Sequence, residues 1–451
     1  MRTVSCLFSR ILISTIPSLL VWLSLGGLGY GQTVVTTSAV GGVSIDASGL
    51  VSNAQQDALG ALAAMRSQTL EKIPADLKTM VGMRKVSLRQ LETTLQDCVK
   101  NDKPIPDAVK YLAGLQGVRY VFVYPEKKDI VLVGPGEGWK VDAKGYVVGA
   151  TTGRPVLLLD DLVTALRTAQ AAANGGIACS IDPTTEGLAR LNQELPALAS
   201  AGDPAAMARG IENALGLQQI SVRGVPDTSH FARVLVAADY RMKRIAMNFD
   251  PSPIRSLPSY LQMVKPAKKM VSPRFWLEPR YDALLRDADG LAFELRGASV
   301  KALTEEDFIA QSGSVQHTGK ASPAAQRWTA MMTDRYAELA LVDPIFGQLQ
   351  NCMELAVVGA LVVKEQLPAK AGGQMSALLK SSDVKTETFN APKQVESKAS
   401  ALKRGRGWVL SASGGVAINS WQIADQVRVS DEIAPERAKA AAGQGDSWYW
   451  N

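Results

Sequence analysis

The stretch RPVLLLDDLVTALRTAQAAANGGIACSIDPTTEGLARL, residues 154–191, contains the alternation that decides the fold class. Its first part, residues 154–160, is short and apolar, which is typical of a buried strand. A helical pattern follows and ends at the Asn-Gly-Gly of residues 174–176, because such residues commonly terminate helices. Another short strand, residues 177–181, leads into the Asp-Pro pair 182–183, a cap and a proline that favour a second helix. This stretch therefore predicts strands and helices that alternate along the chain.

The same alternation extends in both directions. Residues 118–124 and 128–134 are rich in β-branched and aromatic residues and predict strands, whereas residues 87–99 have helical spacing. Further on, residues 272–304 predict strands, and two long helices are expected within residues 322–365. We therefore predict an α+β (mixed α/β) fold, in which short mixed sheets pack with helices and the second half contains a long two-helix hairpin.

The chain has 451 residues, which is enough for two or three domains. The pattern resets near SAGDP at residues 200–204, and residues 367–407 are rich in Lys, Ser, Ala and Gly with little periodicity. The expected division is a signal peptide (1–31), an N-terminal α/β domain (32–203), a C-terminal α+β domain (204–366), a flexible linker or loop (367–407), a returning strand (408–430) and a disordered tail (431–451).

The N-terminus has the pattern of a secretory signal. Arg2 and Arg10 precede the apolar run ILISTIPSLLVWLSLGGL, and the small residues Gly29 and Gly31 occupy the −3 and −1 positions of a cleavage site before Gln32. An uncleaved membrane anchor is the alternative, but a proline and several glycines weaken the long helix that an anchor needs. We predict export with removal of residues 1–31. N-terminal sequencing of exported protein that begins at Met1 would contradict this prediction.

Composition and charge place limits on the class of protein. Hydrophobic residues make up 46% of the chain and charged residues 20%, so a packed protein is expected rather than a disordered one. The 49 Lys and Arg nearly balance the 43 Asp and Glu, and the short basic clusters lack interleaved aromatic residues. We expect no nucleic-acid partner and, after signal cleavage, no stable membrane insertion.

A D-A-x-G pattern occurs three times, in segments that end at Gly49, Gly145 and Gly290. Asp at the first position of a type I turn and Gly at the fourth suit a three-residue hairpin connection, in which the glycine takes a left-handed conformation. Each segment therefore predicts a hairpin. A cation-binding loop is the weaker alternative, since the acids that an EF-hand loop requires are missing.

Catalytic chemistry has only weak candidates in this sequence. The acids considered are Asp160, Asp161, Asp182 and Glu186, which could serve a hydrolase as general acid and base. Acids after a buried strand can also bind a metal, but a cap on the following helix is the favoured interpretation of the Asp160–Asp161 pair.

The two histidines of the chain, His230 and His317, exclude a multi-histidine metal site, and neither lies in a catalytic motif. No nucleophile elbow and no phosphate-binding glycine loop is present. We predict no cofactor and no metal.

Signal cleavage would remove Cys6 and leave Cys98, Cys179 and Cys352. An odd number in an exported chain indicates either one disulfide with a free thiol or three buried thiols. If a disulfide forms, the pair Cys179–Cys352 is favoured, which would tie the two halves together and leave Cys98 free.

Several strings are similar to those of a known family: YVFVYPEKKDIVLVGPGEGW, GRPVLLLDDLVTALR, CSIDPTTEGLARL, HFARVLVAADYRMKRI and GKASPAAQRWTAMMTDRYAELALVDPIFGQLQNCMELA. Over roughly residues 115–365 the chain resembles a family of exported proteins of unknown function found mainly in planctomycete bacteria. The resemblance implies export to the cell envelope and carries no activity. Cys179 and Cys352 lie inside the matching strings.

The leading hypothesis for function is a soluble exported protein that acts as a binding or scaffold component of the envelope, with a partner still to be identified. Two alternatives stay open. One is a carboxylate-dependent hydrolase acting on envelope polymer, and the other is a sensor of a small ligand in a cleft between two domains. A concave site with two carboxylates would favour the hydrolase. The oligomeric state is left open.

Overall fold

The computed structural model describes residues 42–54, 61–200, 203–264, 273–310, 312–380, 383–400, 402–404, 407–409, 413–443, 445 and 447–451. The expected signal peptide, residues 1–31, lies outside them. All described residues belong to one compact unit, Ser38–Asn451.

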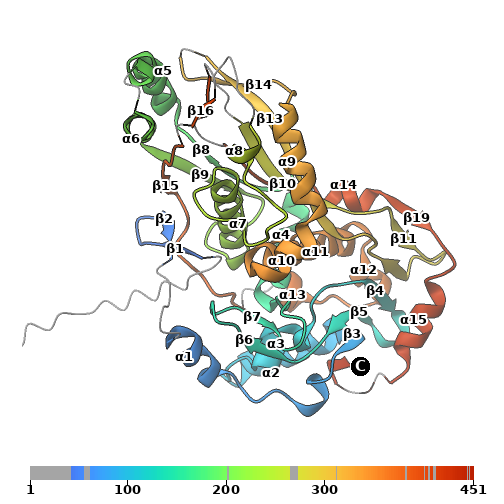
Figure 1. Cartoon of the computed structure of the whole chain (residues 1–451). Coiled ribbons are helices and arrows are strands. Elements are labelled where there is room, and N and C mark those ends of the chain that lie inside the picture. The colour runs from blue at the N-terminus through green and yellow to red at the C-terminus, as the bar shows by residue number, and fades with distance from the viewer. Residues whose placement is uncertain are drawn as a thin grey trace, which may run out of the picture. The chain divides into compact units, whose positions relative to one another are not determined.

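A nine-stranded mixed sheet combines segments from almost the whole length of the chain (Figure 1). In spatial order its strands are β1 (Val43–Ile45), β2 (Leu50–Asn53), β15 (Gln394–Glu396), β9 (Leu217–Arg223), β8 (Ile177–Asp182), β18 (Ser413–Ile418), β10 (Pro273–Arg280), β13 (Ser299–Ile309) and β14 (Val315–His317). β8 pairs antiparallel with both β9 and β18, while β18 pairs parallel with β10. Alternate residues of β8 are buried, as expected for a strand with one face on the core.

A seven-stranded sheet forms the second layer of strands. Its order is β19 (Val427–Val429), β11 (Leu284–Arg286), β12 (Ala292–Glu294), β4 (Tyr120–Tyr124), β5 (Asp129–Gly136), β3 (Val81–Ser87) and β20 (Tyr449–Trp450). Two small hairpins complete the strands, β6 (Trp139–Val141) with β7 (Val147–Gly149), and β16 (Leu402–Arg404) with β17 (Gly407–Val409). β4 and β5 are buried along almost their full length, which agrees with their apolar sequences.

The helices are α1 (Ala61–Thr69), α2 (Leu88–Lys100), α3 (Asp107–Lys110), α4 (Leu159–Ala172), α5 (Thr185–Ser200), α6 (Pro204–Leu215), α7 (His230–Ala246), α8 (Tyr260–Met263), α9 (Pro323–Asp334), α10 (Tyr336–Val342), α11 (Pro344–Lys364), α12 (Leu367–Ala371), α13 (Ser376–Leu379), α14 (Ser420–Asp425) and α15 (Ala434–Ala441). Three single turns of 3-10 helix lie at Ala75–Leu77, Leu112–Gly114 and Pro125–Lys127.

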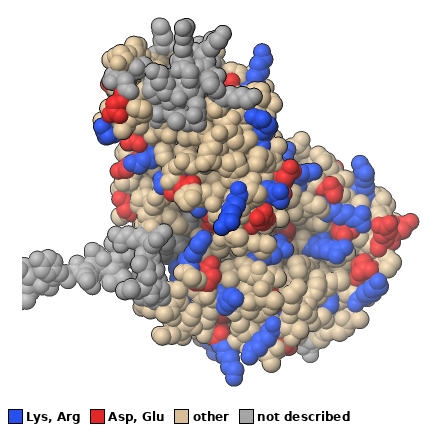
Figure 2. Space-filling view, viewed as in Figure 1, with Lys and Arg blue, Asp and Glu red and all other residues tan. Residues whose placement is uncertain are grey.

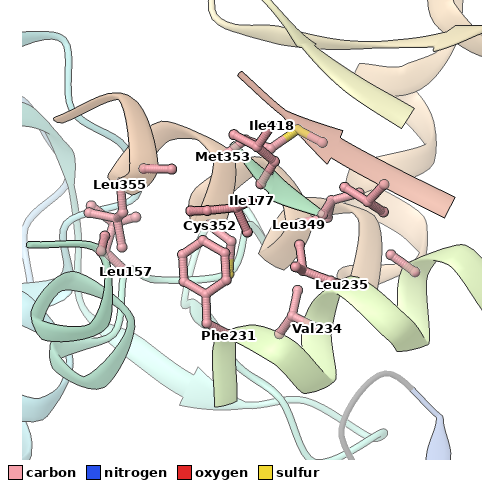
Figure 3. Close-up of a cluster of buried hydrophobic side chains, with 14 of the residues drawn as sticks. Leu157, Ile177, Phe231, Val234, Leu235, Leu349, Cys352, Met353, Leu355 and Ile418 are labelled. Carbon is pink, nitrogen blue, oxygen red and sulfur yellow. The ribbon is translucent and has the colours of Figure 1, made fainter. Parts of the chain in front are cut away.

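Helix α11 lies at the centre of the core. It contacts α4, α7, α10 and α14, and in Figure 1 it runs between the two large sheets. The helix is long and apolar enough to cross a membrane, but 89% of its most apolar window is buried in the protein. An apolar surface on every side of a helix is typical of a core helix. Figure 3 shows Leu349 and Met353 of α11 packed with Val234 and Leu235 of α7 and with Ile418 of β18.

The α+β fold class is confirmed, with mixed sheets packed against helices. The expected hairpin of long helices is present, but its first helix is divided. Arg335 has non-helical dihedral angles and separates α9 from α10.

The predicted strand at residues 154–160 is wrong in type: this run makes one isolated bridge at Pro155, and α4 begins at Leu159. A short apolar run does not distinguish a buried strand from a buried helix start.

The predicted domain boundary at residues 203/204 is also wrong. The nine-stranded sheet contains β8 from before this position and β9, β10 and β18 from after it, so both halves share one core. The expected linker, 367–407, contains α12, α13 and β15, and β15 pairs with β2 and β9. Sheet hydrogen bonds between distant segments hold this part in place.

The prediction of a disordered tail at 431–451 is wrong. The segment forms α15 and then β20, which pairs antiparallel with β3. Trp450 is 8% exposed, and its indole N–H donates to the carbonyl of Ala440 at 3.0 Å. Burial of one large aromatic side chain is worth about 2–3 kcal/mol, which offsets part of the conformational entropy lost when the segment becomes ordered.

The three D-A-x-G segments each join two adjacent antiparallel strands, which is the arrangement that the pattern predicts. They connect β1 to β2, β6 to β7, and β11 to β12. Gly49, Gly145 and Gly290 have φ values of +87°, +84° and +68°. The aspartate of each turn accepts hydrogen bonds from backbone N–H groups within the turn, as Asp287 does from Leu291.

Candidate functional site

The acid pair Asp160–Asp161 lies in the first turn of α4, but neither residue caps the helix as the sequence predicted. The N-cap position belongs to Leu158, without a side-chain hydrogen bond to the helix. Asp161 instead faces His230 at the start of α7, with Nδ1 of the imidazole 3.0 Å from each carboxylate oxygen. The thiol of Cys352 on α11 donates to the same carboxylate. Three segments that are distant in sequence therefore meet at Asp161.

The His230–Asp161 pair is almost closed to solvent, with 11% and 5% of the side chains exposed. Burial lowers the pKa of the imidazole, but the negative charge of Asp161 and its hydrogen bond outweigh burial, so the pKa of His230 is raised. Burial, together with the negative charge of Asp161 and the hydrogen bond to it, raises the pKa of the Cys352 thiol well above its ordinary value. Cys352 is therefore a structural thiol rather than a nucleophile.

A segment from the expected linker covers this cluster. The backbone N–H of Glu387 donates to Asp160 at 3.1 Å, and that of Phe389 donates to the carbonyl of Thr228 at 2.8 Å. The guanidinium of Arg233 lies 4.7 Å from the centre of the Phe389 ring. These contacts hold the segment over the starts of α4 and α7.

The other two acid candidates lie elsewhere. Asp182 ends β8 and Glu186 is exposed in the first turn of α5, so neither joins the pair on α4. The four acids considered as hydrolase residues therefore do not form one site. The negative charge of Asp182 acts instead on Asp239, a residue of α7 that sequence reasoning missed.

Asp239 and Lys243 of α7 form a buried ion pair where this helix packs against the nine-stranded sheet. Nζ of Lys243 lies 2.9 Å from Oδ2 of Asp239 and also donates to the carbonyls of Ile181 and Gly414. Burial raises the pKa of Asp239 to about 6, although Lys243 lowers it. The available signal in the sequence was an acid and a lysine four residues apart on an otherwise apolar helix face.

The disulfide Cys179–Cys352 is not formed. Both residues are buried free thiols, as is Cys98. Cys352 packs beside Phe231 at the start of α7 (Figure 3), whereas the charged neighbours of Cys179 are Asp239 and Lys243, about two turns and roughly 12 Å further along that helix. Of the two alternatives, the structure has the three buried thiols and not the Cys179–Cys352 bond, because these two cysteines contact different parts of α7.

Glu305, Asp307 and His317 lie close together where β13 pairs with β14, with one possible ligand atom of each within 4.8 Å of the others. A guanidinium nitrogen of Arg274 lies 3.3 Å from Glu305 and 3.1 Å from Nδ1 of His317. Arg274 thus pairs with Glu305, while Asp307 lies 2.9 Å from Nδ1 of His317. Within the described residues, the arrangement is a charged surface network.

A cavity of about 270 Å³ lies where α10 and α11 meet the segment before α4. Its lining consists of Arg154, Pro155, Ala298, Ala337, Ala340, Leu341, Gly347, Gln350 and Asn351. Ala337 and Leu341 are exposed at the rim, whereas Pro155, Gly347 and Asn351 are buried. Sequence reasoning singled out none of these residues, because nearly 200 positions separate the loop from α11.

A second, much smaller cavity of about 40 Å³ lies over the end of α7. Tyr240, Lys243 and Arg244 line it together with Glu396 and Lys398. Its charged side chains are already paired, Lys243 with Asp239 and Arg244 with Asp250. Neither cavity is lined by Asp160, Asp161, Asp182 or Glu186.

Comparison with known proteins gives one match. A family model described as a protein of unknown function, DUF1598, matches residues 179–260, from β8 to α8. The matched stretch contains His230 and the Asp239–Lys243 pair. Searches of curated proteins and of solved structures found no match.

Proposed function

We propose that this chain is an exported binding protein of the cell envelope and that it acts without a catalytic step. The observation that supports binding is the lining of the 270 Å³ cavity, which is apolar apart from one guanidinium and two amide side chains. Sites for small ligands commonly combine an apolar wall with a few polar groups that fix orientation. Export is supported by the N-terminal sequence pattern, Arg2 and Arg10 before an apolar run.

The same lining disfavours the hydrolase alternative. No Asp, Glu, His, Ser, Cys, Lys or Tyr is among the cavity residues, so the described site offers neither a nucleophile nor a general base. An Arg guanidinium stays protonated and cannot relay a proton near neutral pH. The acids that sequence reasoning considered are engaged elsewhere, Asp161 with His230 and Asp160 with the backbone of Glu387.

The charge distribution on one face of the molecule supports a partner other than nucleic acid. On the face shown in Figure 2, Lys and Arg side chains alternate with Asp and Glu instead of forming one broad basic patch. A nucleic-acid surface would gather positive charge along one face.

The test uses purified peptidoglycan as a probe of envelope polymer. We expect the protein to sediment with the polymer and to release no soluble fragments or new reducing ends. Ala337→Trp should reduce binding at least about fivefold, because an indole at the rim would block the cavity mouth. Ala205→Trp is the matched control, since Ala205 is also exposed but lies on α6.

Unchanged sedimentation of the Ala337→Trp variant would contradict binding through this cavity. Release of reducing ends by the wild-type protein would instead establish the hydrolase alternative.

A further inference from the structure

Hydrogen bonds within its loop hold the backbone of Arg154, the positively charged residue of the cavity. The backbone N–H of Arg154 donates to Oγ1 of Thr152 at 3.2 Å, and its carbonyl accepts from the N–H of Gly149 at 2.8 Å. Thr152 is fixed in turn by Glu137, which accepts its backbone N–H at 3.0 Å and that of Thr151 at 2.8 Å. The backbone of Arg154 is therefore in place before any ligand enters.

Glu137 keeps its negative charge at neutral pH. Burial of the carboxylate would raise its pKa, but hydrogen bonds from Thr151 and Thr152 outweigh burial, so the pKa of Glu137 is lowered. Gln116 donates to the same carboxylate at 2.8 Å. A charged carboxylate with several donors forms strong, directional bonds, which makes the loop rigid.

The guanidinium of Arg154 makes no hydrogen bond or ion pair among the described residues. It lowers the pKa of Glu354 through its charge, yet the two groups do not approach within ion-pair distance. An unpaired guanidinium that lines a cavity is suited to a carboxylate, since its planar donors match the two carboxylate oxygens.

Two amide oxygens complement this cation. The Nδ2 group of Asn351 donates to the carbonyls of Pro155 and Val156, at 3.1 and 3.3 Å. The Nε2 group of Gln350 donates to the carbonyl of Ala298 at 3.3 Å. The amide nitrogens are thus used within the protein. The Oε1 and Oδ1 atoms make no hydrogen bond in the described part of the chain, so they can accept N–H groups of a ligand.

The rest of the lining is small and apolar. Pro155, Ala340 and Leu341 supply aliphatic contacts, and Gly347 presents no side chain. A volume of about 270 Å³ lies just below the usual range for drug-sized ligands, so the ligand must be small or must be the end of a larger chain.

From this juxtaposition we infer that the cavity takes the C-terminal carboxylate of a short peptide whose last side chain is small and apolar. Arg154 binds the carboxylate, the oxygens of Gln350 and Asn351 accept peptide N–H groups, and the aliphatic wall accommodates a methyl or similar group. The inference rests on the proposed function, since it names the chemistry that the cavity recognises.

The test compares two probes that differ in one charge, acetyl-Ala-Ala and acetyl-Ala-Ala-amide, by isothermal titration calorimetry at low salt. We expect the acid to bind the wild-type protein at least about tenfold more tightly than the amide, since a charge-assisted pair is lost with the amide. Arg154→Gln should abolish the preference. Arg154→Lys should retain part of it, because an ammonium keeps the charge without the planar fork.

Arg428→Gln is the control, because Arg428 is exposed on β19 and does not line the cavity. Equal affinities for acid and amide in the wild-type protein would overturn the inference, and so would an equal loss of preference in Arg428→Gln and Arg154→Gln. If acid and amide bind equally while Ala337→Trp still weakens sedimentation with peptidoglycan, the ligand class is wrong and the binding function stands. If Ala337→Trp has no effect on sedimentation, the function itself fails.

Discussion

Replacing Lys243 with Met is expected to lower the free energy of unfolding by about 3–5 kcal/mol at pH 8, the usual result of removing one partner from a buried ion pair. The side chains of Asp239 and Lys243 are 0% and 10% exposed. Oδ1 of Asp239 already lacks a hydrogen bond, so Lys243 supplies the main compensation for this carboxylate. The substitution would leave a buried negative charge with no cation beside it.

The lysine also links two neighbouring strands to α7. Its Nζ donates to the carbonyl of Ile181 on β8 at 2.9 Å and to that of Gly414 on β18 at 3.0 Å. Both bonds would be lost in Lys243→Met, and the two carbonyls near the centre of the sheet would lose this donor. A buried acceptor without a donor costs about 1–3 kcal/mol.

Urea unfolding at pH 5 and pH 8 measures the effect of Lys243→Met on the free energy of unfolding. Without Lys243 the pKa of Asp239 should rise above its present value of about 6, because only the weaker effect of the Arg274 charge then opposes burial. A folded-state pKa above the unfolded one means that the carboxylate destabilises the fold as pH rises, so the loss in Lys243→Met should be smaller at pH 5 than at pH 8. The double variant Asp239→Asn/Lys243→Met should recover part of the loss, since no buried charge remains.

Lys439→Met is the control for the loss of a lysine. Lys439 lies 2.7 Å from Glu436, but its side chain is 70% exposed, so we expect a change below about 1 kcal/mol. A loss of less than about 1 kcal/mol in Lys243→Met as well would show that the buried pair is not important for stability.

Local sequence patterns predicted the elements whose signal lies within a few residues. The spacing of Leu88, Leu91 and Leu95 predicted α2, and all three side chains are buried. The D-A-x-G turns were found for the same reason, because an aspartate and a glycine within four residues determine the turn. Such patterns depend on the chain near them and not on the rest of the fold.

The errors concern interactions between distant segments. Trp450 at the end of the chain gives no periodic signal, yet it is buried at the end of β20, which pairs with β3, and this contact makes the expected tail part of the fold. The boundary near residue 203 resembled a linker in composition, but strand pairing across it unites both halves. Composition reports local polarity and not which strand a segment will join.

The candidate sites show the same limit. Asp161 and His230 were each noted in the sequence, but their contact joins positions 69 residues apart, and no local pattern predicts it. The cavity depends on Arg154 and on Gln350 and Asn351 of α11, residue types that are common on protein surfaces. Their importance arises because the fold brings them to one cavity, which becomes visible only once the fold is known.

The Glu354→Gln substitution is expected to stabilise the protein at pH 8 and to leave its stability almost unchanged at pH 4.5. Glu354 is 6% exposed on α11, and one of its carboxylate oxygens accepts the backbone N–H of Val118. Burial raises the pKa of this carboxyl to about 7, although the hydrogen bond from Val118 and the charge of Arg154 lower it. The carboxyl is therefore ionised in the folded protein only above about pH 7.

The sign of the pH dependence follows from the two pKa values. In the unfolded chain a glutamate ionises near its ordinary pKa of 4.5, so between pH 4.5 and 7 the folded state binds a proton that the unfolded state has lost. The free energy of unfolding therefore falls as pH rises through this window. The total fall is about 3 kcal/mol by pH 8, at about 1.4 kcal/mol for each pH unit.

A glutamine at position 354 has nearly the same shape as the acid, and its Oε1 can accept the same hydrogen bond from Val118. It carries no charge at any pH, so the fall of about 3 kcal/mol should be absent from the variant. His230 and Asp239 also have raised pKa values, but they are present in both proteins and cancel in the difference. Urea unfolding of both proteins at pH 4.5 and 8 gives that difference directly.

Glu396→Gln is the control, because its side chain is 67% exposed and should contribute less than about 0.5 kcal/mol at either pH. An equal effect of Glu354→Gln at both pH values would mean that the pKa of the buried carboxyl does not change on folding. A gain in stability confined to pH 8 would show that the ionised Glu354 destabilises the folded protein.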